Sequence, residues 1–353
     1  MLLSVIICAK DEEKYIARAI NSIINQPRFD EIELIVVDDG SKDNTEKIIE
    51  SFCERYKNIK ILKHTKNIGT GSSRNDALKL VTSKYVAFLD ADDWWEKKIF
   101  DDELVESLNK DFDLYGFSFQ KISYDYSYKA EHNEENKIIT SKNEIVYTGQ
   151  LLCTFIYKKN IIDKNNLNFF NTKINEDITF TQRYFEIIDN INYSNKMMYN
   201  YYMNSDSIMH APYSNDLFND TIKSIELLDA WYKKNKLTYH KEYSMLRIIA
   251  QKLPYLCAIN DYKELKMLLS NNSNITYVLE NYKRYPIDDN LMNRIYRYNK
   301  NSYMFYITNK IIYGIKERIR LSIYKTHIIR KLETFILYGV ILKAKKINHD
   351  ELI

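Results

Sequence analysis

The chain has 353 residues, of which 45% are hydrophobic and 28% charged, and its formal net charge is +3. This length suffices for one large or two ordinary domains with a sizeable core, and the near balance of charge gives no reason to expect a nucleic-acid partner. The four cysteines lie far apart without a CxxC pair, so the sequence predicts neither a zinc site nor a disulfide framework. Reduced thiols in the cytoplasm are the simplest interpretation.

The chain begins with a short apolar run that lacks a basic leading region and turns charged from Lys10 onward. We therefore predict a buried strand here rather than a signal peptide. The sequence has no run of about 18 uncharged apolar residues, so we expect no helix that spans a membrane.

Short apolar runs rich in β-branched residues alternate with helix-spaced segments over the first ninety residues. The runs predict four strands, at residues 4–8, 33–37, 59–62 and 85–89. Apolar residues with helical spacing lie between them, at residues 15–24, 48–53 and 77–81. This alternation is typical of βαβ units and predicts a parallel sheet covered by helices on both faces.

Acidic residues follow three of these strands. Asp11 and Glu13 follow the first strand, residues 38–41 follow the second and residues 90–93 follow the fourth. Because ligands of open α/β sheets bind at the carboxyl ends of the strands, three acidic clusters at one edge predict a single site. For Asp39, helix capping or turn formation is the alternative to ligand contact.

Residues 90–93 place three carboxylates directly after an apolar strand. Like charges at a strand end repel, and a hard divalent cation or a cationic ligand offsets that repulsion. We interpret the segment as a metal-diphosphate site, with an acidic turn as the alternative because Asp is common in turns. The glycine-containing loop at residues 67–75 leads into a helix with Arg74 in its first turns, and backbone donors with a guanidinium suit a phosphate.

Taken together, residues 4–16, 35–45, 67–75 and 88–93 resemble family 2 glycosyltransferases. These enzymes have the GT-A fold, a Rossmann-like α/β fold with a mostly parallel sheet flanked by helices. They transfer a sugar from a nucleotide-diphosphate sugar with inversion at the anomeric carbon. One departure is Cys8-Ala9-Lys10-Asp11 where the family often has Pro-Thr-Tyr-Asn, so the aromatic side chain that would lie against the base is missing.

The resemblance implies a UDP-sugar donor and a divalent cation, Mn²⁺ or Mg²⁺. Asp39 would bind the uracil ring, and Arg74 would lie near the base or the diphosphate. Asp92 and Asp90 match the DxD motif, with Asp92 as the direct metal ligand and Asp90 nearer the ribose. Asp93 would support these ligands or face the acceptor. The implied nucleotide-sugar site comprises Cys8, Ala9, Asp11, Glu13, Asp39, Asn67, Gly71, Arg74, Asp90 and Ala91.

Inverting transfer also needs a base that deprotonates the acceptor hydroxyl. Residues 178–188 have helical spacing, with Asn175 as the predicted cap and with Glu176 and Asp177 in the first turn. The helix dipole favours acids there for structural reasons alone, whereas the Glu-Asp pair resembles the family's catalytic-base motif. We predict Asp177 as the base and Glu176 as its partner, and exchange of the two roles is the alternative. His210 resembles a terminal basic residue of the family's domain and is predicted as a metal ligand or, alternatively, a surface histidine.

We predict a GT-A domain over residues 1–210 and an α-helical region over residues 211–353. Residues 303–346 contain ten Lys or Arg and two Glu, with apolar residues on one helical face. This basic amphipathic segment can lie on an anionic membrane or pack on the catalytic domain. The predicted location is therefore the cytoplasm, at the inner face of the cell membrane if the segment binds lipid.

The predicted acceptor is a surface glycan, or a lipid-linked or envelope molecule. A processive synthase is disfavoured because the chain lacks the QxxRW element, so we expect transfer of one or a few sugars. A nucleotidyltransferase is one alternative, but it should show a glycine-rich loop directly after the first strand, and residues 8–14 contain no glycine. A non-catalytic carbohydrate-binding protein on the same scaffold is the other alternative.

Overall fold

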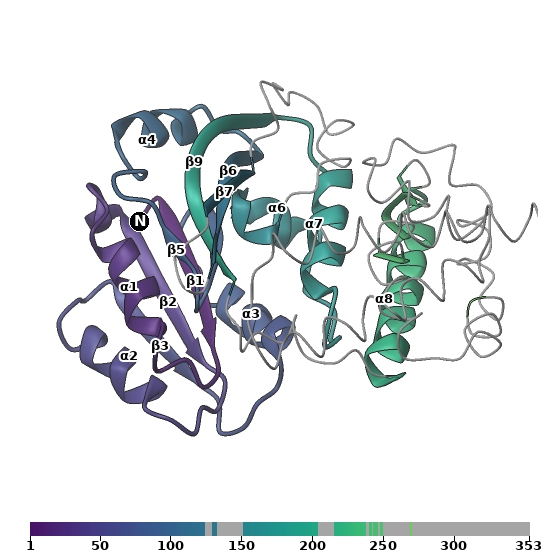
Figure 1. Cartoon of the computed structure of the whole chain (residues 1–353). Helices are drawn as coiled ribbons and strands as arrows, with labels where there is room; N and C mark the ends of the chain where they lie inside the picture. The colour runs from purple at the N-terminus through teal and green to yellow at the C-terminus, as the bar shows by residue number, and fades with distance from the viewer. Residues whose placement is uncertain are drawn as a thin grey trace, which may run out of the picture. The chain divides into compact units, whose positions relative to one another are not determined.

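The computed structural model describes residues 1–123, 129–132, 151–203 and 215–237, with single positions up to Leu269. The chain divides into two compact units: Met1–Pro212 with Glu226–His240, and Tyr213–Ile225 with Lys241–Ile353. The first unit contains the sheet, whose strands are seen in Figure 1, and its residue range includes all the predicted site residues. Most of the predicted α-helical region, including residues 303–346, lies outside the described residues.

The N-terminal part of the sheet is parallel. Its strands are β1 (Leu3–Ala9), β2 (Ile32–Asp38), β3 (Ile59–Lys63) and β4 (Tyr85–Asp90), in the order β3-β2-β1-β4. Strands β1, β2 and β4 are buried along almost their whole length, as expected for a sheet covered on both faces. The four predicted strands are thereby confirmed.

The helices between these strands are α1 (Ile16–Ile24), α2 (Thr45–Cys53) and α3 (Thr70–Leu78). A short 3₁₀ turn, η1 (Phe29–Glu31), precedes β2. Helices α1 and α2 contact each other, and α3 packs against β1 and β2 (Figure 1). The predicted helices are confirmed, but α3 begins at Thr70, well before its apolar positions. The glycine-containing loop therefore supplies the first turns of this helix.

The second half of the sheet is mixed. Strand β8 is antiparallel to β4 and β6, β9 is parallel to β6, and β5 is antiparallel to β9. Within the described residues the full order is β3-β2-β1-β4-β8-β6-β9-β5, with β7 paired to β6. The remaining elements are β5 (Trp94–Trp95), α4 (Asp102–Asn109), β6 (Leu114–Ser123), β7 (Lys129–His132), η2 (Leu152–Thr154), β8 (Phe155–Lys158), α6 (Lys159–Lys164), α7 (Glu176–Glu186), β9 (Ile191–Met203) and α8 (Asn215–Lys234).

A cluster of aromatic side chains packs α7 against the sheet. Phe88 on β4 contacts Phe169 and Phe180 edge-on, at ring-centroid distances of 5.3 and 6.0 Å. Phe169 and Phe180 stack at 4.1 Å. All three rings are almost fully buried, and aromatic pairs of this geometry add to the stabilisation from buried area. The cluster fixes the face of α7 that packs on β4, next to the acidic turn at residues 90–93.

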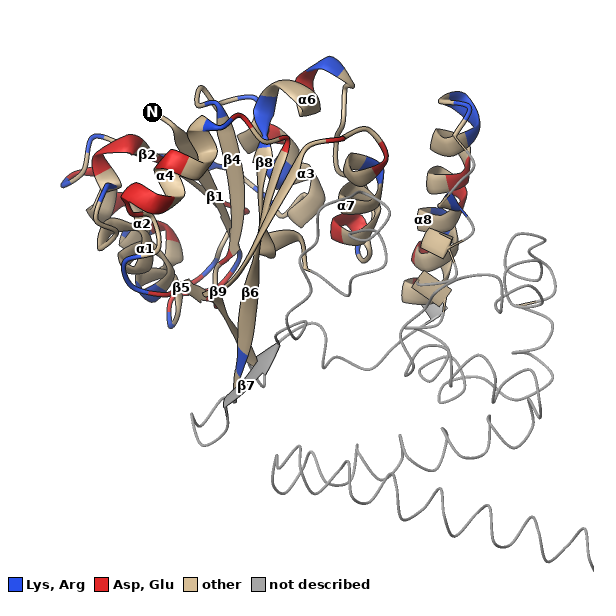
Figure 2. Cartoon of the chain, turned by 90° about the horizontal axis from the view of Figure 1, so that it is seen from above, with Lys and Arg blue, Asp and Glu red and all other residues tan. Residues whose placement is uncertain are grey.

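Charged residues of both signs are spread over the helices of the described chain, for example acids on α4 and basic residues near the end of α8 (Figure 2). This distribution agrees with the balanced composition. None of the described helices is both long and apolar enough to cross a membrane.

Candidate active site

Arg74 joins the acidic turn after β4 to the start of α7. Its Nη2 donates to Asp90 Oδ1 at 2.9 Å, and its Nη1 donates to Glu176 Oε1 at 3.1 Å. These partners lie 16 and 102 residues away along the chain. The exposed fraction of the side chain is 7% for Arg74 and 13% for Glu176 but 43% for Asp90, so the ion pair with Glu176 is the one that is shielded from water and weakly screened. The structure thus brings three predicted site residues together.

Helix α3 is placed for this contact by a close approach to the loop that precedes α7. A Cβ on Gly71 would lie 2.9 Å from the carbonyl oxygen of Phe170, so only glycine permits the observed packing. Asn75 reinforces it, because its Nδ2 donates to Phe169 O at 2.9 Å and its Oδ1 accepts from Phe169 N at 2.7 Å. Gly71 therefore acts in this structure by setting the position of Arg74.

Glu176 and Asp177 occupy the first turn of α7, as predicted. Burial and the charge of Asp177 raise the pKa of Glu176 to about 7, against the lowering effect of Arg74. Asn175 occupies the cap position in the left-handed conformation (φ 65°) but makes no side-chain capping hydrogen bond. The predicted cap residue is thus confirmed, and asparagine suits this position because it tolerates the left-handed conformation.

The acidic turn presents its three carboxylates differently. Asp90 and Asp92 are partly exposed, whereas Asp93 is buried. The Asp93 carboxylate accepts from Tyr202 N at 2.6 Å and from the Tyr199 hydroxyl, both on β9. Burial, with the charges of Asp92 and Asp90, raises the pKa of Asp93 well above its ordinary value. Of the two roles predicted for Asp93, the geometry corresponds to support of the turn.

The predicted metal ligands are only partly within the described residues. His210 lies outside them, and no group of three or more His, Cys, Asp or Glu within the described part of the chain is arranged to hold a metal ion. Asp90 and Asp92 do present oxygen ligands at a partly exposed strand end, which is the donor type that Mg²⁺ and Mn²⁺ prefer. The chemistry of these two residues therefore fits such a cation.

Asp39 organises the loop that follows β3. Its Oδ1 accepts from Ile68 N at 2.9 Å, and its Oδ2 accepts from Gly69 N at 3.0 Å. His64 Nδ1 lies 3.0 Å from Asp39 Oδ1, and His64 Nε2 lies 3.5 Å from Asp76 Oδ2 on α3. Three partners occupy most of the roughly four acceptor positions of a carboxylate. Both the turn-forming and the ligand-binding interpretation of Asp39 are compatible with this arrangement.

Of the three acidic residues after β1, Asp11 and Glu13 accept hydrogen bonds from the loop before α2, whereas Glu12 is influenced by the acidic turn. Asp11 Oδ1 accepts from Lys42 N at 2.6 Å, and Glu13 Oε2 accepts from Asn44 N at 3.0 Å. Both carboxylates thus hold the loop before α2. Glu12, which the sequence did not single out, is affected by the acidic turn: burial, followed by the charge of Asp92, raises the pKa of Glu12 to about 7.

Neither Glu12 nor His64 carried a decisive sequence signal. Asp11 adopts the left-handed conformation (φ 57°), and this backbone turn, which residue spacing does not encode, decides the directions of the three adjacent acids. His64 stood alone at the end of a predicted strand, and only the packing of β2 and α3 places carboxylates on both sides of its ring.

A pocket of about 580 Å³ lies at the carboxyl ends of β1, β2 and β3. Two predicted site residues, Asp11 and Asn67, contribute to its wall. The remaining lining residues are Lys10, Asp38, Gly40, Ser41, Lys42, Glu46, His64, Thr65 and Lys66.

Cys8, near the end of β1, pairs in register with Asp90 on β4. Burial raises the pKa of its thiol to about 12.

Comparisons with known proteins agree with this architecture. The sequence model of glycosyl transferase family 2 matches residues 4–171. The chain is 26% identical over 284 residues to the uncharacterized glycosyltransferase EpsJ of Bacillus subtilis, covering 76% of this chain and 78% of EpsJ. Residues 4–171 belong to glycosyl transferase family 2. This membership makes the chain a glycosyltransferase and disfavours the nucleotidyltransferase alternative.

Two further similar proteins are a relative whose name gives a substrate and a crystal structure that contains a nucleotide sugar. It is 32% identical over 209 residues to the poly(ribitol-phosphate) beta-N-acetylglucosaminyltransferase TarP of Staphylococcus aureus, covering 57% of this chain and 62% of TarP. The crystal structure of S. aureus TarS 1-349 in complex with UDP-GlcNAc matches with a TM-score of 0.68 at 21% identity. That match covers 90% of this chain and 92% of TarS 1-349, and it confirms the predicted GT-A fold.

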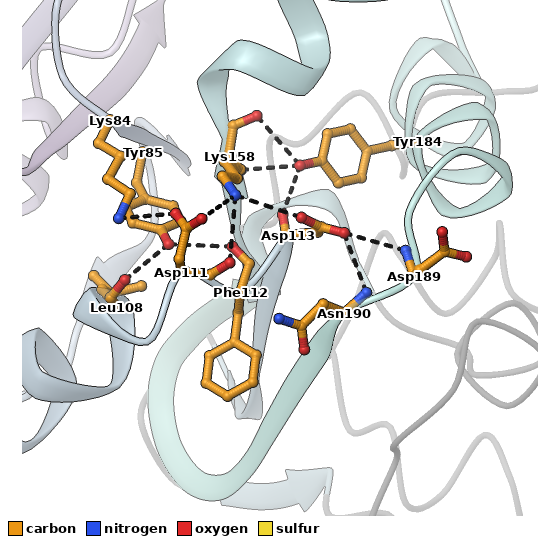
Figure 3. Close-up of polar contacts among 10 residues, drawn as sticks. All are labelled: Lys84, Tyr85, Leu108, Asp111, Phe112, Asp113, Lys158, Tyr184, Asp189 and Asn190. Carbon is orange, nitrogen blue, oxygen red and sulfur yellow. Dashed lines mark hydrogen bonds and ion pairs between the residues drawn. The ribbon is translucent and has the colours of Figure 1, made fainter.

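The helix of the glycosyltransferase that carries the Glu-Asp pair is anchored at the opposite end of the sheet (Figure 3). The Tyr184 hydroxyl on α7 donates to Asp113 O at 2.6 Å and accepts from Lys158 N at 2.9 Å. The Asp113 carboxylate in turn accepts from the backbone N–H groups of Asp189 and Asn190. The start of β6 and the end of β8 therefore hold α7 along its axis, and this anchoring helps to fix Glu176 beside Arg74.

Proposed function

We propose that the glycosyltransferase moves a sugar from a UDP-sugar to a hydroxyl of a surface glycan or a lipid-linked or envelope acceptor, with inversion. The observation that carries this proposal is the Arg74 bridge, which joins the DxD turn to the Glu-Asp pair. The residues that would stabilise the leaving diphosphate and the residue that would deprotonate the acceptor hydroxyl then belong to one site. The crystal structure of TarS with UDP-GlcNAc and the poly(ribitol-phosphate) substrate in the name of TarP support the choice of donor and acceptor class.

Asp92 and Asp90 are the proposed ligands of Mn²⁺ or Mg²⁺, with His210 as a further ligand. A bound cation would supply positive charge to the leaving diphosphate without proton transfer. Arg74 limits the mutual repulsion of the acids because its single positive charge lies between Asp90 and Glu176.

Asp177 is the proposed base that takes the proton from the acceptor hydroxyl. Glu176 is held by Arg74 at 3.1 Å, so we assign it the role of a partner that keeps the first turn of α7 in place. Asp39 and the loop at residues 64–69 would form the nucleoside side of the site. The other members of the predicted nucleotide-sugar set are Cys8, Ala9, Asp11, Glu13, Asn67, Gly71 and Ala91.

A screen of nucleotide sugars, with and without Mn²⁺, tests donor and metal together. Binding and hydrolysis should be strongest with one UDP-sugar and should require the cation. Asp92→Asn should lose most of both, because a neutral amide is a poor ligand for a hard cation. Binding that ignored both the metal and this substitution would reject the metal assignment.

Asp177→Asn tests the base. Transfer should fall by about 10²- to 10⁴-fold, the usual contribution of a positioned base, while donor binding is retained. Asp163→Asn, at an exposed acid on α6, is the control and should behave as wild type. Undiminished transfer by Asp177→Asn would move the role to Glu176 or to another group.

The domain boundary near residue 210 and the membrane contact of residues 303–346 remain proposals. If the basic segment binds anionic lipid, the full chain should sediment with anionic liposomes and a chain ending at Tyr298 should not. Equal partitioning of the two forms would support packing of the segment on the protein instead.

A further inference from the structure

We propose that Arg18 is a positioning residue that holds the backbone of Asp92 so that the acidic turn can bind a cation. The inference rests on the proposed metal-dependent function and adds to it a residue that lies on α1, away from the DxD motif and the Glu-Asp pair.

The side chain of Arg18 makes a short polar contact with the turn. Its Nη2 donates to the carbonyl oxygen of Asp92 at 2.6 Å. A hydrogen bond from a charged donor is about twice as strong as one between neutral groups. It also places positive charge beside a turn that contains three carboxylates and lies near Glu12, where it offsets their repulsion.

Aromatic rings hold the guanidinium in this position. Its central carbon lies 4.1 Å from the ring centroid of Trp94, 4.6 Å from that of Tyr202 and 5.5 Å from that of Tyr15. The rings also contact one another: Tyr202 lies 5.5 Å from Tyr15 and 6.2 Å from Trp94. Arginine suits such a site better than lysine because its planar group stacks on rings and directs its donors at fixed angles.

The turn is consequently fixed from two sides. Helix α1 holds the Asp92 carbonyl through Arg18, and β9 holds the Asp93 carboxylate through Tyr202 N and the Tyr199 hydroxyl. Tyr202 takes part in both contacts, with its ring on Arg18 and its backbone on Asp93. The peptide between Asp92 and Asp93 therefore has little freedom, and the direction of the Asp92 side chain depends on it.

The test measures Mn²⁺ binding in the presence of UDP, by the electron paramagnetic resonance signal of free Mn²⁺, alongside the melting temperature. Arg18→Met should weaken Mn²⁺ binding by about tenfold, the lower end of the effect of residues that orient metal ligands. Arg18→Lys should lie between Arg18→Met and wild type, because it keeps the charge but loses the stacking. Arg28→Met, whose guanidinium pairs with Glu31 and Asp102 instead, should bind Mn²⁺ as wild type does.

Trp94→Leu is a second test of the role of Arg18, because it removes one of the rings that contact the guanidinium and leaves Arg18 itself unchanged. It should weaken Mn²⁺ binding, and the combined Arg18→Met and Trp94→Leu changes should cost less than the sum of the single changes. Wild-type Mn²⁺ affinity in Arg18→Met, or a lower melting temperature with unchanged affinity, would overturn the inference about Arg18 alone. Absence of Mn²⁺–UDP binding by the wild-type enzyme would instead reject the metal-dependent function from which it follows.

Discussion

Arg74 lies between two carboxylates from different parts of the chain, and its charge opposes the effect of burial on the titration of Glu176. Burial and Asp177 raise the pKa of Glu176 from its ordinary 4.5 to about 7, although Arg74 lowers it. The native protein therefore binds a proton at Glu176 more readily than the unfolded chain does. Between these two pH values, the contribution of Glu176 to stability falls as pH rises.

We expect the Glu176→Gln enzyme to lose less stability than wild type between pH 5 and pH 8. Glutamine keeps the shape of the side chain but does not titrate. The part of the pH dependence of the free energy of unfolding that comes from Glu176 should therefore disappear. Urea unfolding at four pH values measures the free energy directly. Glu106→Gln, at an exposed position on α4, should keep the wild-type slope. An equally steep slope in Glu176→Gln would contradict the titration of this group.

Gly40 and Gly69 form a natural pair for separating backbone strain from steric conflict. Both have positive φ, 69° and 90°. A Cβ on Gly40 would lie 2.8 Å from backbone atoms of Lys66, whereas a Cβ on Gly69 would have nothing within 4 Å. Gly69 has a ψ of 149°, close to a backbone region that is open almost only to glycine, so Gly69→Ala should cost about 1–3 kcal/mol from backbone conformation alone. Gly40→Ala should cost clearly more, since the loop at residues 64–69 must move.

Thermal and urea unfolding of the two alanine variants measures this difference. Because Asp39 holds the same loop through Ile68 and Gly69, Gly40→Ala should also weaken binding of the nucleotide. Equal costs at the two positions would show that the loop adapts to the added methyl group without strain.

Among the elements, α7 carries the predicted base at one end and is held by several partners further along. Tyr184 binds the backbone of Asp113 and Lys158, and Glu186 accepts from the Tyr232 hydroxyl at 2.8 Å. Arg183 stacks on Phe170, in the loop before the helix, with its central carbon 3.7 Å from the ring centroid. These contacts leave α7 little freedom to slide along its axis.

Tyr184→Phe should lower turnover by up to about tenfold, because a small displacement of a reacting group is costly. Its stability cost should be about 1–2 kcal/mol, from lost hydrogen bonds in a buried place. Tyr85→Phe is the matched control: its buried hydroxyl donates to Leu108 O and Phe112 O, neither of which belongs to α7 (Figure 3). It should lose similar stability and keep the wild-type kcat. Equal kcat in both variants would show that α7 is positioned without Tyr184.

For the whole molecule, the contacts at the end of α7 bear on the extent of the catalytic unit. The first compact unit includes Glu226–His240 in addition to Met1–Pro212. Both Tyr232 and His240 contact Glu186, which is 8% exposed, and His240 Nδ1 lies 2.9 Å from its Oε1. A boundary at residue 210 would remove both partners from a buried carboxylate.

A chain ending at residue 240 should accordingly be more stable than a chain ending at residue 210. Leaving a buried carboxylate without these partners costs about 1–3 kcal/mol or more, which thermal unfolding of the two fragments would detect. Glu186→Gln should reduce the difference, because a neutral amide needs less compensation. Equal melting temperatures would favour the boundary near residue 210.

The four parallel strands, the helices between them and the family resemblance could all be predicted from the amino-acid sequence. These features depend on hydrophobic period and on short motifs, which are local properties of the chain. The DxD turn and the Glu-Asp pair could be found in this way, because each is contiguous in sequence.

The contacts that these motifs make could not be predicted in this way and follow from the folded chain. The tertiary structure placed Arg74 between Asp90 and Glu176, buried Asp93 against β9, and brought Arg18 to the Asp92 carbonyl. Such contacts depend on strand order and on the direction of each side chain. A sequence period does not encode them, because residues far apart along the chain meet only once the sheet has formed.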